Sequence, residues 1–137
     1  MPIQYDRGQI GQSADLGTHQ ITADMINRYA TAIGHGSTDE KGPIAGPMFC
    51  NVLTSGAAEQ PKVKVEGGRR RFMAGQSYEP LAPIRPGDSL KAVVRIADMY
   101  EKTGRSGGML FVIRETTFTN QDNLDVAKIR HSLVIQE

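Results

Sequence analysis

Hydrophobic residues at a spacing of three to four predict one amphipathic helix near the start of the chain. They are Ile21, Met25, Ile26, Tyr29, Ala30 and Ile33. Thr22 precedes this pattern as a suitable N-cap, and Gly34 follows it at a position where helices commonly end. We therefore predict a short helix over about 23–33.

The next apolar segment begins at Pro47, ends before Pro61 and has almost no charged side. Proline fits the first turn of a helix, and a helix with so little polar surface is expected to be buried. Its apolar side chains are Met48, Phe49, Val52, Leu53 and Ala57. This pattern predicts a second, buried helix.

Alternation and β-branched residues predict strands in the rest of the chain. Segment 34–43 has no period and is expected to be a loop, and a short extended piece fits near 10–19. Helices followed by strands indicate the α+β class, and an apolar helix cradled by one curved antiparallel sheet is the hot-dog arrangement. The expected strands cover about 72–79, 89–100, 109–119 and 126–135.

Length and charge narrow this picture to one domain over 1–137. A net charge of +1 argues against a nucleic-acid partner or a membrane surface, and no apolar run is long enough to span a membrane. The single Cys50 leaves no intramolecular disulfide or cysteine zinc site, and the N-terminus does not resemble a signal peptide. We expect a cytoplasmic protein without a metal or a bound cofactor. The absence of Trp and the 6% aromatic content suggest a core completed by a partner chain.

Two groups of residues, one on a loop and one in a basic segment, could carry acid–base or anion-binding chemistry. His35, Asp39 and Glu40 form an acid–base cluster on a glycine-flanked loop, which is either a rewired catalytic site or a solvated turn. His131 falls on the apolar face of the last strand, where a hydrogen-bonded or interface histidine is expected rather than a catalytic one. Segment 62–71 holds five basic residues, which either bind phosphates or an acidic carrier protein, or form an exposed, soluble linker.

Several segments, in this order, resemble the MaoC-like hydratase/dehydratase family. The similarity is greatest to its N-terminal, FAS1-like dehydratase-type half and to the acyl-binding subunits of hydroxyacyl thioester dehydratases. This resemblance implies a hot-dog fold, an acyl-CoA or acyl-carrier-protein thioester as substrate, and a site at the interface of two hot-dog units whose sheets join edge to edge. The segments are Tyr29-Ala-Thr-Ala-Ile-Gly34, Gly46-Pro-Met-Phe49, Pro83-Ile-Arg-Pro-Gly-Asp-Ser-Leu90, 100–112 and 115–121.

The chain departs from the family at the catalytic loop. Catalytic members carry Gly-Asp, then Asn-Pro, then His. Here Gly34 is followed by His35, Ser37 and Thr38 replace Asn-Pro, and Glu40 stands at the position of the histidine. The resemblance therefore implies a half that depends on a partner for its acid–base pair.

We expect one subunit of a heteromeric enoyl-CoA hydratase or 3-hydroxyacyl thioester dehydratase, with a catalytic MaoC-like hot-dog partner. Two alternatives stay open: a self-sufficient homodimeric hydratase or thioesterase that uses His35 or Asp39, and a non-catalytic acyl-CoA-binding module. Some of the expected substrate-binding residues could equally be packed in the core or belong to a turn. These expected residues are Met48, Phe49, Val52, Met73, Arg85, Gly87, Arg69, Arg70 and Arg71.

Overall fold

A computed structural model describes residues 3–54, 61–105 and 107–137 of the chain, and it confirms the first predicted helix. Helix α1 covers Ala23–Ile33. The Thr22 hydroxyl accepts a hydrogen bond from the Met25 amide at 3.2 Å, and Gly34 ends the helix in the left-handed region with φ of 74°. Both helix boundaries therefore lie where the capping residues place them.

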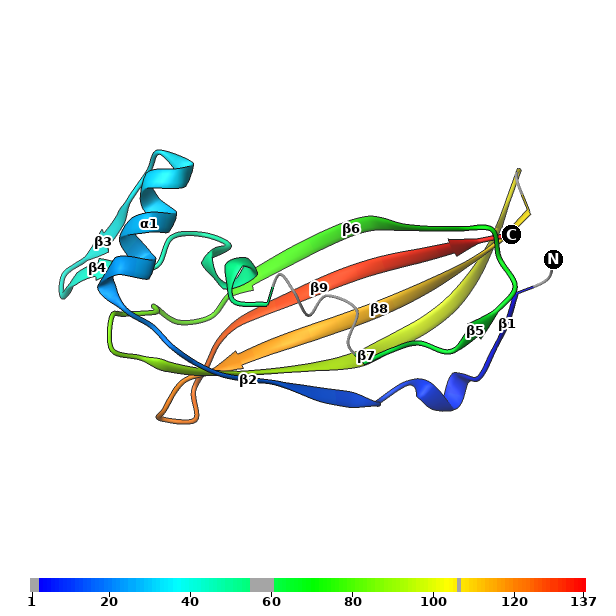
Figure 1. Ribbon diagram of the computed structural model, residues 1–137, viewed down its shortest axis with the longest axis horizontal. Coiled ribbons are helices and arrows are strands. Elements are labelled where there is room, and N and C mark those ends of the chain that lie inside the picture. The colour runs from blue at the N-terminus through cyan, green and yellow to red at the C-terminus, as the bar shows by residue number, and fades with distance from the viewer. Residues whose placement is uncertain (1–2, 55–60, 106) are drawn as a thin grey trace.

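One five-stranded antiparallel sheet forms most of the molecule, with strand order β2-β7-β8-β9-β6 (Figure 1). All four strands predicted from alternation and β-branched residues are confirmed, and the short extended piece near 10–19 is an edge strand. The two long hairpins β7–β8 and β8–β9 make up the middle of the sheet. The strands are β2 (Ser13–Gln20), β6 (Arg70–Pro80), β7 (Ser89–Gly104), β8 (Gly107–Thr119) and β9 (Asp125–Gln136).

Short elements occupy the connections. Within the predicted loop 34–43, strand β3 (Ser37–Asp39) pairs with β4 (Gly42–Ile44), which the sequence did not indicate. At the other end of the sheet, β1 (Gln4–Tyr5) pairs with β5 (Val65–Glu66), and a 3₁₀ turn, η1, covers Arg7–Gln9. Figure 1 shows α1, β3 and β4 together at one end of the sheet and both chain termini at the other.

The second predicted helix is wrong for the part of it that the structure describes. Residues 49–52 form a four-residue 3₁₀ helix, η2 (Phe49–Val52), and the segment 55–60 lies outside the described residues. Met48 has a φ of 61°, in the left-handed region, so a right-handed α-helix that begins at Pro47 cannot continue through it. The expected burial is confirmed at Phe49 and Cys50, which are both fully buried.

Buried side chains gather on one face of the sheet, which we call the inner face. Register places β9 residues Ile129, His131 and Leu133 on this face, opposite Tyr78, Gln76 and Met73 of β6. The inner-face core near α1 contains fully buried Phe49, Leu90, Ala92, Phe118, Ala127 and Ile129, and the core towards the termini contains Ile96, Met99, Leu110, Val112 and Ile135.

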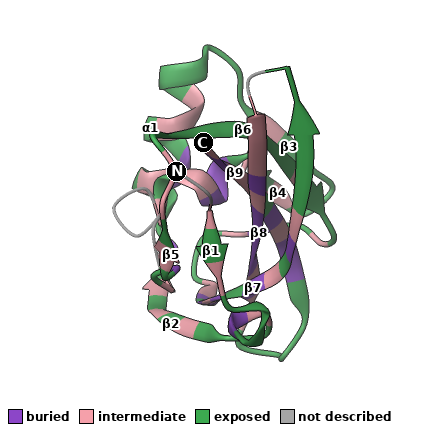
Figure 2. Cartoon of the chain, turned by 90° about the vertical axis from the view of Figure 1, so that its right-hand side faces the viewer, coloured by how far each residue is buried: buried purple, intermediate pink, exposed green. Residues whose placement is uncertain are grey.

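Strand β6 is an exposed edge of the sheet. Exposed residues follow it along almost its whole length (Figure 2), and in the described sheet only β9 pairs with it. Its Phe72 and Met73 are 44% and 54% exposed. An exposed edge of this length presents unpaired backbone groups that can pair with another chain.

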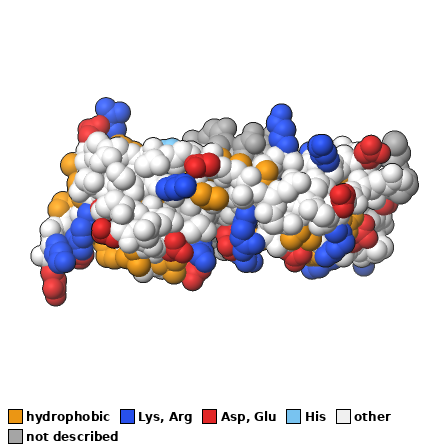
Figure 3. Space-filling view, turned by 90° about the horizontal axis from the view of Figure 1, so that it is seen from below, with side chains coloured by type: hydrophobic (Ala, Val, Ile, Leu, Met, Phe, Trp, Pro, Cys, Tyr) orange, Lys and Arg blue, Asp and Glu red, His pale blue; other side chains and the backbone are white. Residues whose placement is uncertain are grey.

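The surface carries charges of both signs. On the face drawn in Figure 3, Lys and Arg side chains are interspersed with Asp and Glu, and hydrophobic side chains gather towards the end at which α1 lies. No helix within the described ranges is long and apolar enough to cross a membrane.

Candidate acyl-binding site

An open pocket of about 660 Å³ lies between the β3–β4 hairpin, the loop that follows it, the end of β6 and segment 82–84. We call it the apolar pocket, because its walls are mostly aliphatic. Among its described lining residues, only Ser37, Gln76 and Tyr78 present polar side-chain groups. The lining consists of Ser37, Ile44, Ala45, Gly46, Pro47, Met48, Gln76, Tyr78, Pro80, Ala82, Pro83 and Ile84.

Three contacts hold the loop walls of this pocket. The Ala45 amide donates to the Ile84 carbonyl at 2.8 Å, which joins the wall after β4 to the wall before the 85–88 turn. The Tyr29 hydroxyl donates to the Pro47 carbonyl. The Tyr29 ring meets Phe49 edge-on, with centroids 5.6 Å apart. Met48 is thus fixed between two anchored neighbours, which hold its backbone in the left-handed conformation.

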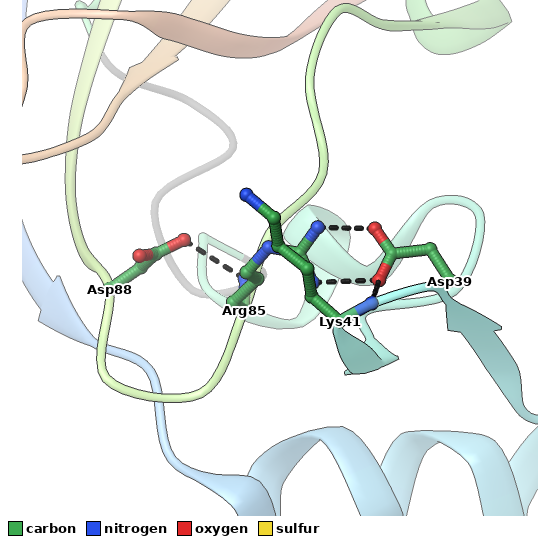
Figure 4. A network of polar contacts seen from close by, with 4 residues as sticks. All are labelled: Asp39, Lys41, Arg85 and Asp88. Carbon is green, nitrogen blue, oxygen red and sulfur yellow. Dashed lines mark hydrogen bonds and ion pairs between the residues drawn. The ribbon is translucent and has the colours of Figure 1, made fainter.

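Arg85 and Asp39 form a two-pronged ion pair beside the pocket (Figure 4). Arg85 Nη1 donates to Asp39 Oδ1 at 2.8 Å, and Nη2 donates to Oδ2. The Lys41 amide also donates to Oδ1, at 2.9 Å. Asp88 accepts a hydrogen bond from the Arg85 amide at 2.9 Å. This network connects the β3–β4 hairpin to the 85–88 turn.

The ion pair makes Asp39 a poor general base. The hydrogen bonds from Arg85 lower the pKa of Asp39, and the Lys41 amide lowers it further, although partial burial opposes both. A general base works best when its pKa lies near the operating pH, and a carboxylate held this firmly in its ionised form binds a proton weakly. Asp39 is therefore suited to positioning the loop.

The other two members of the predicted acid–base cluster do not join Asp39 in a site. His35 and Glu40 are exposed, and neither lines the apolar pocket. The His35 amide donates to the Ala30 carbonyl at 3.0 Å, which continues the end of α1. Among the described residues, no group of three or more His, Cys, Asp or Glu could bind a metal ion.

Tyr78 lines the pocket and interacts with the fully buried Cys50 behind it. Burial raises the pKa of the Cys50 thiol to about 12, although a hydrogen bond with Tyr78 opposes this shift. Burial, followed by the charge of the Cys50 thiolate, also raises the pKa of Tyr78. Both groups therefore stay protonated at neutral pH, and the thiol is unsuited to act as a nucleophile.

The structure separates the predicted substrate-binding residues. Met48 lines the apolar pocket, whereas Phe49 is fully buried below it and Val52 is 52% exposed outside its lining. Arg85 lies at the rim in the ion pair. Gly87 has a φ of 95° and forms the turn before β7, where its amide donates to the Ile21 carbonyl at 2.7 Å.

A second open pocket, of about 500 Å³, lies farther along β6, and we call it the cationic pocket. Of the three predicted arginines, only Arg71 lines it; Arg69 and Arg70 do not. Burial and the nearby Arg114 charge lower the pKa of His131, so the imidazole is neutral at neutral pH. The lining consists of Lys62, Val63, Arg71, Phe72, Met73, Arg114, His131 and Leu133.

Sequence reasoning missed Gln76 and Tyr78 of the apolar pocket and Arg114 of the cationic pocket. Gln76 and Tyr78 are two residues apart on β6, so strand alternation could have placed them on one face. The alternation of β8 and β9 would likewise have paired Arg114 with His131. Ser37 and the Arg85–Asp39 pair depend on how two loops meet, and no local pattern encodes that meeting.

The chain matches one known protein family in sequence and several solved structures in fold. A sequence model of the family described as "FAS1-like, dehydratase domain region" matches residues 8–129. No curated protein is detectably similar in sequence. Solved structures, in contrast, match over nearly the whole chain.

Three of those structures illustrate the match. R-hydratase PhaJ1 from Pseudomonas aeruginosa has a TM-score of 0.64 and 21% identity, over 93% of this chain and 82% of that one. A MaoC-like dehydratase from Rhodospirillum rubrum has a TM-score of 0.65 and 18% identity, over 93% of this chain and 92% of that one. The HadBC (3R-hydroxyacyl-ACP dehydratase) complex from Mycobacterium tuberculosis has a TM-score of 0.69 and 17% identity, over 92% of this chain and 96% of that one. At these identities the likeness concerns the fold, and it confirms the predicted α+β hot-dog fold.

Proposed function

Because the chain belongs to the MaoC-like hydratase/dehydratase family, we propose that it is one subunit of a heteromeric enoyl-CoA hydratase or 3-hydroxyacyl thioester dehydratase. It contributes an acyl pocket and a dimer surface, and a partner hot-dog subunit contributes the Asp and His that move the proton. The substrate is an acyl thioester of CoA or of an acyl-carrier protein.

The state of Asp39 is the observation that carries this proposal. Adding water across an enoyl thioester needs a general base and acid near one water molecule. Both carboxylate oxygens of Asp39 are engaged by Arg85, and no described residue lining the apolar pocket is a carboxylate or an imidazole. These observations support a pocket that holds an apolar acyl chain and an acid–base pair that another chain contributes.

The β6 edge supports the partner. Gln76, Tyr78 and Pro80 of β6 line the apolar pocket, so a subunit that pairs with this edge lies next to the acyl group. The HadBC structure, which shares the fold, is described as a complex. A partner at β6 would bring its own loop to the open side of the pocket.

An activity assay with separated subunits tests the proposal. The chain alone, a hot-dog partner that carries Gly-Asp, Asn-Pro and His, and their mixture are each incubated with trans-2-decenoyl-CoA, and hydration is followed by loss of enoyl absorbance. We expect turnover from the mixture that exceeds the sum of the two separate rates. Full activity from the isolated chain would show that it carries its own acid–base pair and would refute the proposal.

Two matched variants separate the edge from general surface effects. Phe72→Asp places a charge on the β6 edge, whereas Leu124→Asp makes the same kind of change at a residue of similar exposure, 52%, between β8 and β9. Phe72→Asp should weaken association with the partner in sedimentation and lower the activity of the mixture. Leu124→Asp should leave both unchanged.

A further inference from the structure

Two of the basic residues that line the cationic pocket form no ion pair with another described residue. Lys62 and Arg71 both line it and are exposed, and neither forms an ion pair within the part of the chain that the structure describes. No carboxylate is among the described lining residues. The positive potential of the pocket is therefore available to an anion.

Hydrophobic side chains surround these charges. Val63, Phe72, Met73 and Leu133 contribute to the lining, and Arg114 beside them donates to the Pro61 carbonyl at 3.3 Å. Where a bound ligand displaces water from these apolar walls, attraction between opposite charges becomes stronger. A guanidinium can make two parallel hydrogen bonds to phosphate oxygens, and an ammonium can add a point charge. The lining thus suits a phosphate group attached to a less polar body.

Both pockets lie along the same face of β6. Arg71 and Met73 belong to the cationic pocket, and Gln76 and Tyr78 belong to the apolar one. Strand rise puts Met73 and Gln76 roughly 10 Å apart. In Figure 1, β6 runs from the end with the chain termini to the end with α1, so the two pockets follow one another along the strand.

We propose that the cationic pocket, through Arg71 and Lys62, binds the phosphate end of an acyl thioester whose acyl group occupies the apolar pocket. The pantetheine arm then lies along β6 between them. This inference rests on the proposed function, because it takes an acyl thioester as the ligand. It assigns the phosphate contact to one arginine of the basic segment.

The strand itself provides a matched control. Register pairs Arg71 with Ile135 on the inner face, and Arg70 with Gln136 on the opposite face. The two arginines are adjacent, both are exposed, and replacing either with Gln removes the same charge. Long-range attraction predicts equal effects at both positions, whereas a phosphate site predicts an effect at Arg71 alone.

The experiment compares three probes by calorimetry on the full chain: decanoyl-pantetheine, decanoyl-4′-phosphopantetheine and decanoyl-CoA. Charge-assisted hydrogen bonds to phosphate should make the two phosphate-bearing probes bind about tenfold tighter than decanoyl-pantetheine. Arg71→Gln should remove most of that gain, Lys62→Gln should remove part of it, and Arg70→Gln should preserve it. Unchanged unfolding midpoints check that each variant is folded.

The outcomes separate the phosphate site from the acyl pocket. If all three probes bind the wild-type chain equally, or if Arg70→Gln weakens binding as much as Arg71→Gln, the phosphate site is refuted while the acyl pocket stands. If no probe binds, the acyl pocket is refuted and the phosphate site with it. Tighter binding of decanoyl-CoA than of decanoyl-phosphopantetheine identifies CoA as the source of the phosphate, and equal binding of these two shows that the phosphate on pantetheine suffices.

Discussion

The two pockets on the inner face are built in different ways. The apolar pocket is enclosed mainly by loops, which a few specific contacts hold together: Ala45 with Ile84, Tyr29 with Pro47, and Arg85 with Asp39. The cationic pocket is formed largely by strand residues that β alternation places on one face. The shape of the first therefore depends on specific contacts between loops, whereas the charge of the second depends on strand register.

Among the predictions that compare the two pockets, truncating a buried side chain under the apolar pocket should change the free energy of unfolding most. Phe49 is fully buried and packs edge-on against Tyr29 under the apolar pocket. Truncating a core Phe to Ala costs about 3–5 kcal/mol, so Phe49→Ala should lower the free energy of unfolding by that amount. Denaturant unfolding measures this change.

Phe72 is the matched control, because it lines the cationic pocket and is 44% exposed. Phe72→Ala removes the same side chain but little buried contact, and it should change stability by no more than about 0.5 kcal/mol. Equal losses at both positions would show that the two pockets do not differ in this way.

The next largest effect should come from backbone strain. It should make glycine more stabilising than alanine at Met48 of the apolar pocket and less stabilising than alanine at the cationic pocket. Met48 has a φ of 61°, and the left-handed region costs a residue with a side chain roughly 1–2 kcal/mol, which glycine avoids. Met48→Gly should therefore be more stable than Met48→Ala by about 1 kcal/mol. Chemical denaturation of the two variants under identical conditions gives the difference.

Met73 is the corresponding methionine of the cationic pocket and lies in regular strand β6. Its backbone is not in the left-handed region. There, Met73→Gly should be less stable than Met73→Ala by about 0.5–1 kcal/mol, because glycine loses more chain entropy on folding. The same order of stability at both positions would contradict the strain assigned to Met48.

The two construction modes also explain what the sequence could predict. Capping at Thr22 and Gly34, and alternation through β6 to β9, are local signals, so α1 and the main strands followed from them. The helix predicted from Pro47 onwards failed over its described part because an apolar composition is equally compatible with a buried 3₁₀ turn.

The candidate site was predicted less well than the fold, because it depends on contacts between distant segments and local signals do not reveal them. Met48 and Arg71 line pockets, but the basic run at 69–71 gave no sign that Arg70 and Arg71 face opposite sides of a strand. The sequence made Asp39 a candidate general base, but in the structure its carboxylate is paired with Arg85, a residue 46 positions away. Long-range pairing of this kind depends on the folded chain and leaves no periodic trace.

The smallest expected effect is a pH dependence confined to the cationic pocket. Burial, and then the Arg114 charge, lower the pKa of His131 below its ordinary value of 6.5. The unfolded chain therefore takes up this proton at a higher pH than the folded chain does. The contribution of neutral His131 to stability is complete above pH 6.5 and declines as the pH falls below it. One full proton would give about 1.4 kcal/mol per pH unit, and a partial shift gives a fraction of that.

His131→Gln should make the loss of stability between pH 7 and pH 5 less steep, because glutamine takes up no proton. Urea unfolding at a series of pH values measures the slope for the wild type and the variant, and NMR titration of the His131 ring gives the folded-state pKa directly. A titration midpoint at or above 6.5, or identical slopes for the two proteins, would contradict the prediction. A lower midpoint with a reduced slope would show that His131 stays neutral beside Arg114, so that the imidazole adds no positive charge to the pocket at neutral pH.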